Sequence, residues 1–116
     1  MKNTEVVDTT SKYIVKSTGI GSETDEELVN AKELIDGTNE SKVSLIECYY
    51  LIENVSSAVG TLTISADSES TGLILTGKGK YGLRPGQLKF GDDELFKLTT
   101  DSNVRSYLLV TEFRRN

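Results

Sequence analysis

The chain has 116 residues, of which 13 are Lys or Arg and 18 are Asp or Glu, so its net charge at pH 7 is −5. This length suits one domain with a two-layer core, and the negative charge disfavours nucleic acid as a partner. Histidine is absent and cysteine occurs once, which excludes histidine-based catalytic triads and thiolate metal sites.

The charges are unevenly distributed along the chain. Residues 1–58 carry five basic and eleven acidic side chains, whereas residues 59–116 carry eight and seven. Patches of opposite sign could help copies of the protein to meet one another or a larger scaffold. The first 13 residues lack the apolar run of a signal peptide, and no segment approaches the roughly 18 apolar residues of a membrane span. We therefore expect a soluble protein made in a cytoplasm, with no membrane partner.

Residues 1–11 are polar, and only Val6 and Val7 offer apolar side chains to bury. We interpret them as a flexible arm that orders only against a neighbour. Residues 12–116 then form a single domain. Its first predicted strand is Lys12 to Ser17.

The segment from Thr24 to Gly37 is ambiguous. Thr24 to Glu27 is a capping-box pattern, Gly37 is placed to end a helix, and the apolar residues between them lie near one helical face. A strand over residues 27–30 followed by one helical turn at residues 32–36 fits an all-β chain equally well. The sequence leaves both alternatives open.

Residues 41–67 predict a central β-hairpin. Its first strand alternates so that both faces are apolar, as expected inside a sheet or sandwich. Leu62, Ile64 and Ala66 alternate with polar residues in the second strand, which predicts one buried face. Cys48 and the adjacent tyrosines are interpreted as core residues.

Further strands are predicted at residues 73–75, 94–99 and 104–113, with a long irregular loop at residues 77–91 that contains five glycines and the only proline. About six short strands at spacings near ten residues, joined by turns, predict an all-β fold with at most one short helix. We expect an antiparallel β-sandwich of jelly-roll or immunoglobulin-like type.

The loop at residues 77–91 contains a basic and aromatic cluster. Arginine and tyrosine are enriched at protein interfaces, so this pattern predicts protein contact, with an ordinary solvated loop, or a nucleic acid or glycan contact, as the alternatives. The P-loop spacing is missing, and the acidic groups at residues 25–27, 67–69 and 92–94 fall in predicted turns without the spacing of a calcium loop. We predict no catalytic residue, metal or cofactor.

The order of the motifs resembles that of small virion proteins of tailed bacteriophages, particularly those of marine phages. The resemblance covers roughly residues 12–116 and rests on these segments: KYIVKSTG, LVNAKELIDG, VSLIECYYLIENV with GTLTISAD, LILTGKGKYGLRPGQL, ELFKLTT and SYLLVTEFRRN. It implies a compact β-sandwich that decorates or cements a capsid, without a cofactor or catalytic residues.

The resemblance further implies that the protein binds the major capsid protein or other virion proteins at the capsid surface, as a homo-oligomer. We expect the contacts to come from the arm and the basic loop, through Val6, Val7, Lys78, Lys80, Tyr81, Arg84, Lys89 and Phe90. The alternative roles are a head-tail joining protein, a fibre-associated protein, and a carbohydrate-binding module with Tyr81 and Phe90 as a stacking platform.

Overall fold

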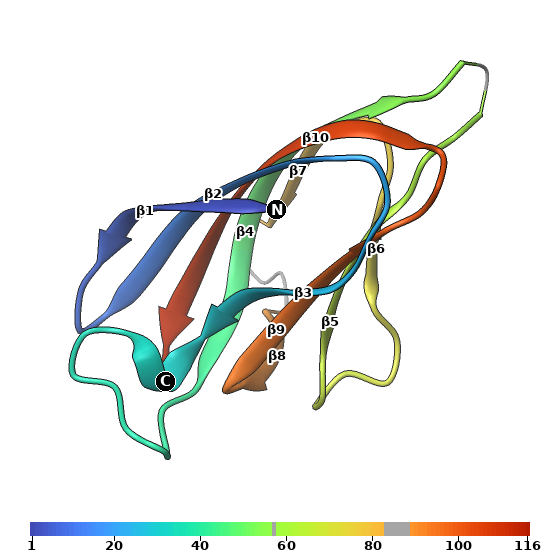
Figure 1. Ribbon diagram of the computed structural model, residues 1–116. Coiled ribbons are helices and arrows are strands. Elements are labelled where there is room, and N and C mark those ends of the chain that lie inside the picture. The colour runs from blue at the N-terminus through green and yellow to red at the C-terminus, as the bar shows by residue number, and fades with distance from the viewer. Residues whose placement is uncertain (57, 83–88) are drawn as a thin grey trace.

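The protein is a β-sandwich of two antiparallel sheets packed face to face, as a computed structural model shows (Figure 1). The structure describes residues 1–56, 58–82 and 89–116. The predicted all-β antiparallel sandwich is confirmed. The only helical element in these ranges is the short 3-10 turn η1 (Ala31–Glu33).

The larger sheet, sheet A, has the strand order β1-β2-β10-β4-β7, and β8 also pairs with β4. Its strands are β1 (Lys2–Asp8), β2 (Lys12–Ile20), β4 (Val43–Asn54), β7 (Lys78–Gly82), β8 (Phe90–Asp93) and β10 (Val104–Arg115). The smaller sheet, sheet B, has the order β3-β9-β5-β6. Its strands are β3 (Glu23–Asn30), β5 (Leu62–Ala66), β6 (Leu73–Leu75) and β9 (Leu95–Thr100).

The core lies between the two sheets and follows the alternation of the strands. In β9, Phe96, Leu98 and Thr100 are buried, and the residues between them are partly exposed. Phe96 of sheet B meets Phe113 of sheet A edge to face, with ring centroids 5.0 Å apart. This aromatic pair therefore joins the two layers.

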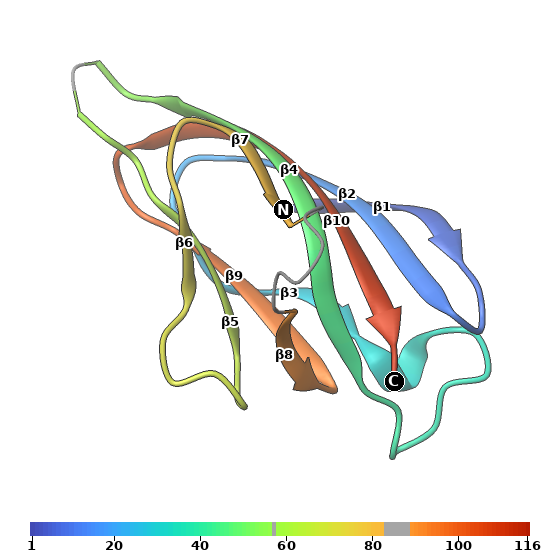
Figure 2. The same cartoon turned by 180° about the vertical axis from the view of Figure 1, so that it is seen from behind.

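The predicted hairpin over residues 41–67 is wrong, because its two strands belong to different sheets. β4 pairs with β10, β7 and β8, whereas β5 pairs with β6 and β9 (Figure 2). Between them the chain passes from one layer to the other. Val55 N donates to the Asn103 carbonyl oxygen at 2.9 Å, and Gly60 N donates to the side-chain Oδ1 of Asn54 at 2.9 Å. The apolar sides of β4 and β5 thus face each other across the core.

A β-bulge in β4 changes which residues face the core. Leu45 is opposite Phe113 and Glu47 is opposite Glu112, so Ile46 has no partner in β10. Before the bulge Leu45 is buried, and after it Cys48 is buried while Tyr49 is 46% exposed. Cys48 is confirmed as a core residue, but Tyr49 is not one.

Residues 2–8 are not a flexible arm. They form β1, whose register with β2 runs from Lys2 opposite Thr18 to Asp8 opposite Tyr13. The Asn3 side chain accepts from Ser17 Oγ at 2.6 Å and donates to the Glu27 carbonyl oxygen at 3.0 Å. An edge strand tolerates this polar composition because one of its faces remains in water.

The ambiguous segment follows the second alternative, a strand and one helical turn. β3 spans residues 23–30, and η1 follows at once, with the Asn30 side chain accepting from Lys32 N. Tertiary pairing with β9 overrides the helical pattern. The loop predicted at residues 77–91 is also wrong in part, because β7 and β8 occupy both of its ends.

Candidate protein-binding face of sheet A

The expected contact residues of the first strand lie at an edge of sheet A. Val6 is 57% exposed at a bulge of β1, and Val7 is half-buried opposite Ile14. Lys78 and Lys80 are exposed on β7, at the opposite edge of the sheet. The structure therefore does not bring the two expected groups together, although both border the same sheet.

The rest of the predicted basic and aromatic cluster is dispersed. Phe90 is a core residue, 8% exposed, with its ring centroid 6.3 Å from that of Phe96. Tyr81 is half-buried against the core, and Lys89 is exposed. Arg84 lies outside the described residues. The predicted stacking platform of Tyr81 and Phe90 is therefore wrong.

The outer face of sheet A carries an apolar patch at its centre. Tyr49 is opposite Val110, and in the next outward-facing row Leu51 is opposite Leu108. Tyr49, Leu51 and Leu108 are 46%, 43% and 36% exposed. Since outward residues of β4 and β10 contact water rather than the other sheet, this patch is not part of the core.

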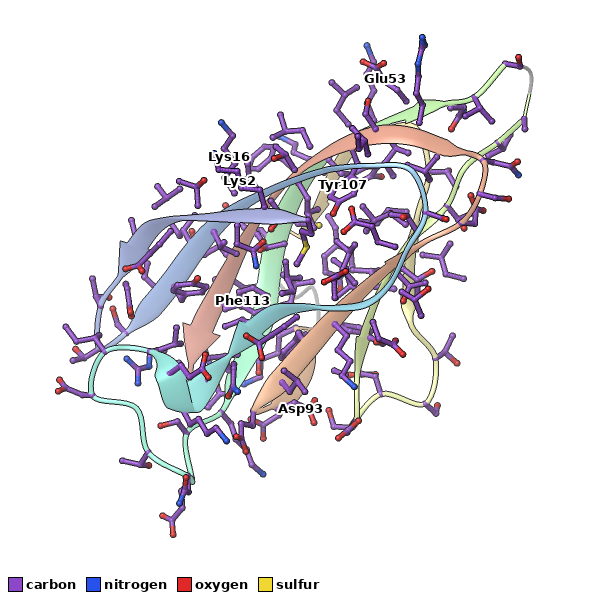
Figure 3. The ribbon with its side chains drawn as sticks, in the orientation of Figure 1. Lys2, Lys16, Glu53, Asp93, Tyr107 and Phe113 are labelled. Atoms are coloured by element: carbon purple, nitrogen blue, oxygen red, sulfur yellow. The ribbon has the colours of Figure 1, made fainter. Side chains whose placement is uncertain are left out.

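Lysines border this patch on both sides. Lys80 is opposite Tyr49 and Lys78 is opposite Leu51. On the other side, Lys16 of β2 is opposite Val110. Thr18 of β2 is opposite Leu108, and Lys2 of β1 is opposite Thr18, so Lys2 lies in the same row as Leu108. Figure 3 shows Lys16 pointing away from sheet B, whereas Phe113 points into the space between the sheets.

We call this surface the lysine-flanked face. It comprises Tyr49, Leu51, Leu108 and Val110 with Lys2, Lys16, Lys78 and Lys80. A groove of about 290 Å³ lies within it, lined by Tyr49, Tyr50, Leu51, Lys78, Gly79, Leu108 and Val110. An apolar groove with a basic rim fits an apolar side chain that has acidic neighbours.

The lysines of this face form no close ion pair among the described residues, because neither ion pair found there involves them. The charge of Lys80 nevertheless acts to lower the pKa of Glu47. Lys80 instead lies over the Tyr49 ring, with its Nζ 5.9 Å from the ring centroid. Acidic residues follow at both ends of the patch: Glu47 is opposite Glu112 beyond the Tyr49 row, and the exposed Glu53 is opposite Ser106 beyond the Leu51 row. Burial, followed by the repulsion of Glu112, raises the pKa of Glu47.

Sequence reasoning missed the apolar half of this face. The two apolar faces of residues 43–52 predict a strand that is buried on both sides, whereas in the structure one of those faces is exposed. An exposed Tyr or Leu in a central strand has the same sequence pattern as a buried one. The useful signal is that residues 104–113 also show two apolar faces, so two neighbouring strands carry more apolar residues than one core requires.

A buried polar cluster lies at one end of the sandwich. Glu23 Oε2 is 2.7 Å from the Met1 α-amino nitrogen, and Tyr107 donates to Glu23 Oε1 at 2.8 Å. The hydrogen bond to Glu23 raises the pKa of the amine. Burial, followed by the hydrogen bond to Glu23, raises the pKa of Tyr107. Its internal pairing gives this cluster a structural role.

The acidic residues in turns bind backbone groups. Asp93 accepts from Ser68 N at 3.0 Å, and Glu69 accepts from Gly91 N at 2.9 Å. Within the described ranges, no group of three or more His, Cys, Asp or Glu side chains could hold a metal ion. In the same ranges no helix is long and apolar enough to cross a bilayer.

Comparison with known proteins identifies no relative, since no protein family, curated protein or solved structure matches this chain significantly.

Proposed function

We propose that this protein is a non-enzymatic structural protein of a bacteriophage virion, of the decoration or cement type. It binds other protein subunits through the lysine-flanked face. The apolar patch at the centre of that face, bordered on both sides by lysines that form no ion pair within the described part of the chain, is the observation that carries the proposal. Apolar side chains on the water-facing side of central strands are typical of a surface that a partner covers.

The face has the physical properties of a preformed docking site. Its apolar residues lie on β4 and β10, two long strands in the middle of sheet A, so their backbone is held on both sides. Binding therefore orders few groups and costs little entropy. The surrounding lysines steer an acidic partner and fix its orientation.

The resemblance in motif order supports the virion part of the proposal. The major capsid protein is the first expected partner, and the capsid surface is the expected location. A head-tail joint or a fibre is the alternative location. No observation favours a carbohydrate-binding role, since Phe90 is buried and Tyr81 packs against the core.

The test uses purified particles of the encoding virus that lack this protein. Wild-type protein and the double variant Leu51→Ser/Leu108→Ser are each added, and bound copies are counted by quantitative gel analysis. We expect occupancy by the variant to require at least about tenfold more protein, because two apolar side chains leave the contact. Ile74→Ser removes an apolar residue of sheet B that is 60% exposed, more than Leu51 or Leu108, and serves as the control.

Imaging of the decorated particles then locates the protein. Density over the capsid lattice supports decoration, and density only at the tail joint supports the alternative virion role. Wild-type protein that does not bind would refute the proposal. Equal occupancy by the wild type and a folded double variant would also refute it.

A further inference from the structure

We propose that the lysine-flanked face receives a second copy of this chain, which inserts the loop at residues 33–40. We call this loop the acidic tip. The inference rests on the proposed function in one respect, that the face binds protein. It adds the identity of the partner, which the complementarity of two surfaces of the same chain indicates.

The acidic tip presents an apolar side chain among carboxylates. Ile35 is 49% exposed, and Glu33, Asp36 and Glu40 are exposed around it in sequence. Lys32, just before the tip, is already paired with Glu94, at 3.6 Å. Among the described residues, no ion pair engages the three acidic side chains of the tip.

Hydrogen bonds on both sides of its backbone hold the tip in place. Ile35 N donates to Asp8 Oδ2 at 3.0 Å, and Arg115 Nη1 donates to the Ile35 carbonyl oxygen. Leu34 is buried, and its carbonyl accepts from Gly37 N at 2.8 Å. The Ile35 side chain is thus displayed by an ordered loop, which lowers the entropic cost of docking.

The face and the tip match in both polarity and charge. The groove in the face takes an apolar side chain, and Ile35 is an exposed one. Lys78 and Lys80 at one side and Lys2 and Lys16 at the other form no close ion pair among the described residues, as is true of the tip's acids. Bringing the two surfaces together pairs both sets of charges.

The two surfaces lie on different parts of the molecule. The tip projects from the end of the sandwich, beyond β1 and β4, while the face covers the flank of sheet A (Figures 1 and 2). Contact between them therefore joins different copies. Two copies can exchange tips in a closed two-fold dimer, or each tip can enter the face of a further copy, which builds a ring or a chain.

The test is sedimentation velocity over a range of protein concentrations at low and high salt. We expect wild-type protein to form dimers or larger species as concentration rises, and to lose them at high salt because the charges are screened. Lys78→Glu/Lys80→Glu blocks the face, and Ile35→Ser/Asp36→Asn blocks the tip. Each variant alone is expected to remain monomeric.

A mixture of the two variants gives the most specific result. The face variant retains its tip and the tip variant retains its face, so a 1:1 mixture is expected to form a dimer and to stop there. Asn suits position 36, where the backbone has a positive φ of 54°. Val59→Ser and Lys97→Glu/Arg105→Glu are the matched controls, and should associate like wild type. Circular dichroism verifies that every variant is folded.

Three results would overturn the inference: a monomeric wild type at all concentrations, a tip variant that still associates, or a mixture that forms no dimer. The proposed function fails separately, through the particle-binding measurement. If wild-type protein is monomeric but decorates particles in a way that depends on Leu51 and Leu108, the function stands and the second copy is excluded.

Discussion

At the scale of single residues, the ion pair between Glu23 and the Met1 amine links stability to pH. The pKa of this amine is raised above its ordinary value of 8.0. A group whose pKa is raised on folding binds its proton more tightly in the folded state. The ion pair therefore contributes fully to the free energy of unfolding below pH 8, and this contribution disappears as the pH rises through the pKa of the amine in the folded state.

We therefore predict that Glu23→Gln lowers the free energy of unfolding at neutral pH and flattens its decline with rising pH. Urea titrations between about pH 7 and pH 9 measure both effects. Glu27→Gln, an exposed change on the same strand that does not act on the amine, should leave the decline nearly intact. Parallel pH profiles for wild type and Glu23→Gln would contradict the assignment.

The single thiol gives a second prediction at this scale. Burial raises the pKa of Cys48 to about 11, and its side chain is fully buried. Because only the thiolate reacts, we expect almost no reaction with an aromatic disulfide reagent at pH 8 until the protein unfolds. The labelling rate should follow the unfolded fraction as urea is added. Rapid labelling of the native protein would show that β4 opens locally.

At the scale of elements, β1 shows how a polar segment becomes a strand. The side chain of Asn3 joins the two sheets at this edge, through Ser17 of β2 and the backbone of Glu27 in β3. Both polar groups of the Asn3 side chain form hydrogen bonds within the protein in place of hydrogen bonds to water. The low hydrophobicity of residues 2–8 therefore does not prevent them from forming a strand. The segment is held by pairing rather than by its own burial.

Asn3→Ala should lower the free energy of unfolding by about 1 to 2 kcal/mol, because it leaves the buried Ser17 hydroxyl without its acceptor. Thr4→Ala, at an exposed neighbouring position of β1, is the matched control and should have a smaller effect. Urea denaturation compares the two. If both variants matched wild type, β1 would contribute nothing to stability.

The sequence predicted elements better than their partners. Apolar patterns bounded by turn residues located β5, β6, β9 and β10 to within a few residues, because each of these strands has a face in the core. The pairing of β4 with β10 rather than β5 has no local signal, since it joins residues far apart in the chain. The face was missed for the same reason: its apolar and basic residues come from β1, β2, β4, β7 and β10, and only the sheet order brings them together.

At the scale of the whole molecule, we expect the aromatic contact between the sheets to make them unfold as one cooperative unit. Phe113 and Phe96 are both fully buried, and Tyr13 extends the cluster, its ring centroid 6.4 Å from that of Phe113. Phe113→Ala should lower the free energy of unfolding by about 3 to 5 kcal/mol. Far-ultraviolet circular dichroism and tyrosine fluorescence should follow the same unfolding transition, in the wild type and in Phe113→Ala. Separate transitions would mean that the sheets unfold independently.

The position of β10 affects how the chain folds while it is being made. β10 comes after β1 to β9 in the sequence, yet it lies between β2 and β4 in the middle of sheet A. Until the ribosome has released it, the edges of β2 and β4 that it will cover remain unpaired. Such edges readily pair with other chains. Nascent protein should therefore be the form most prone to aggregate and most dependent on chaperones, and slowing synthesis before residue 104 should lower its soluble yield.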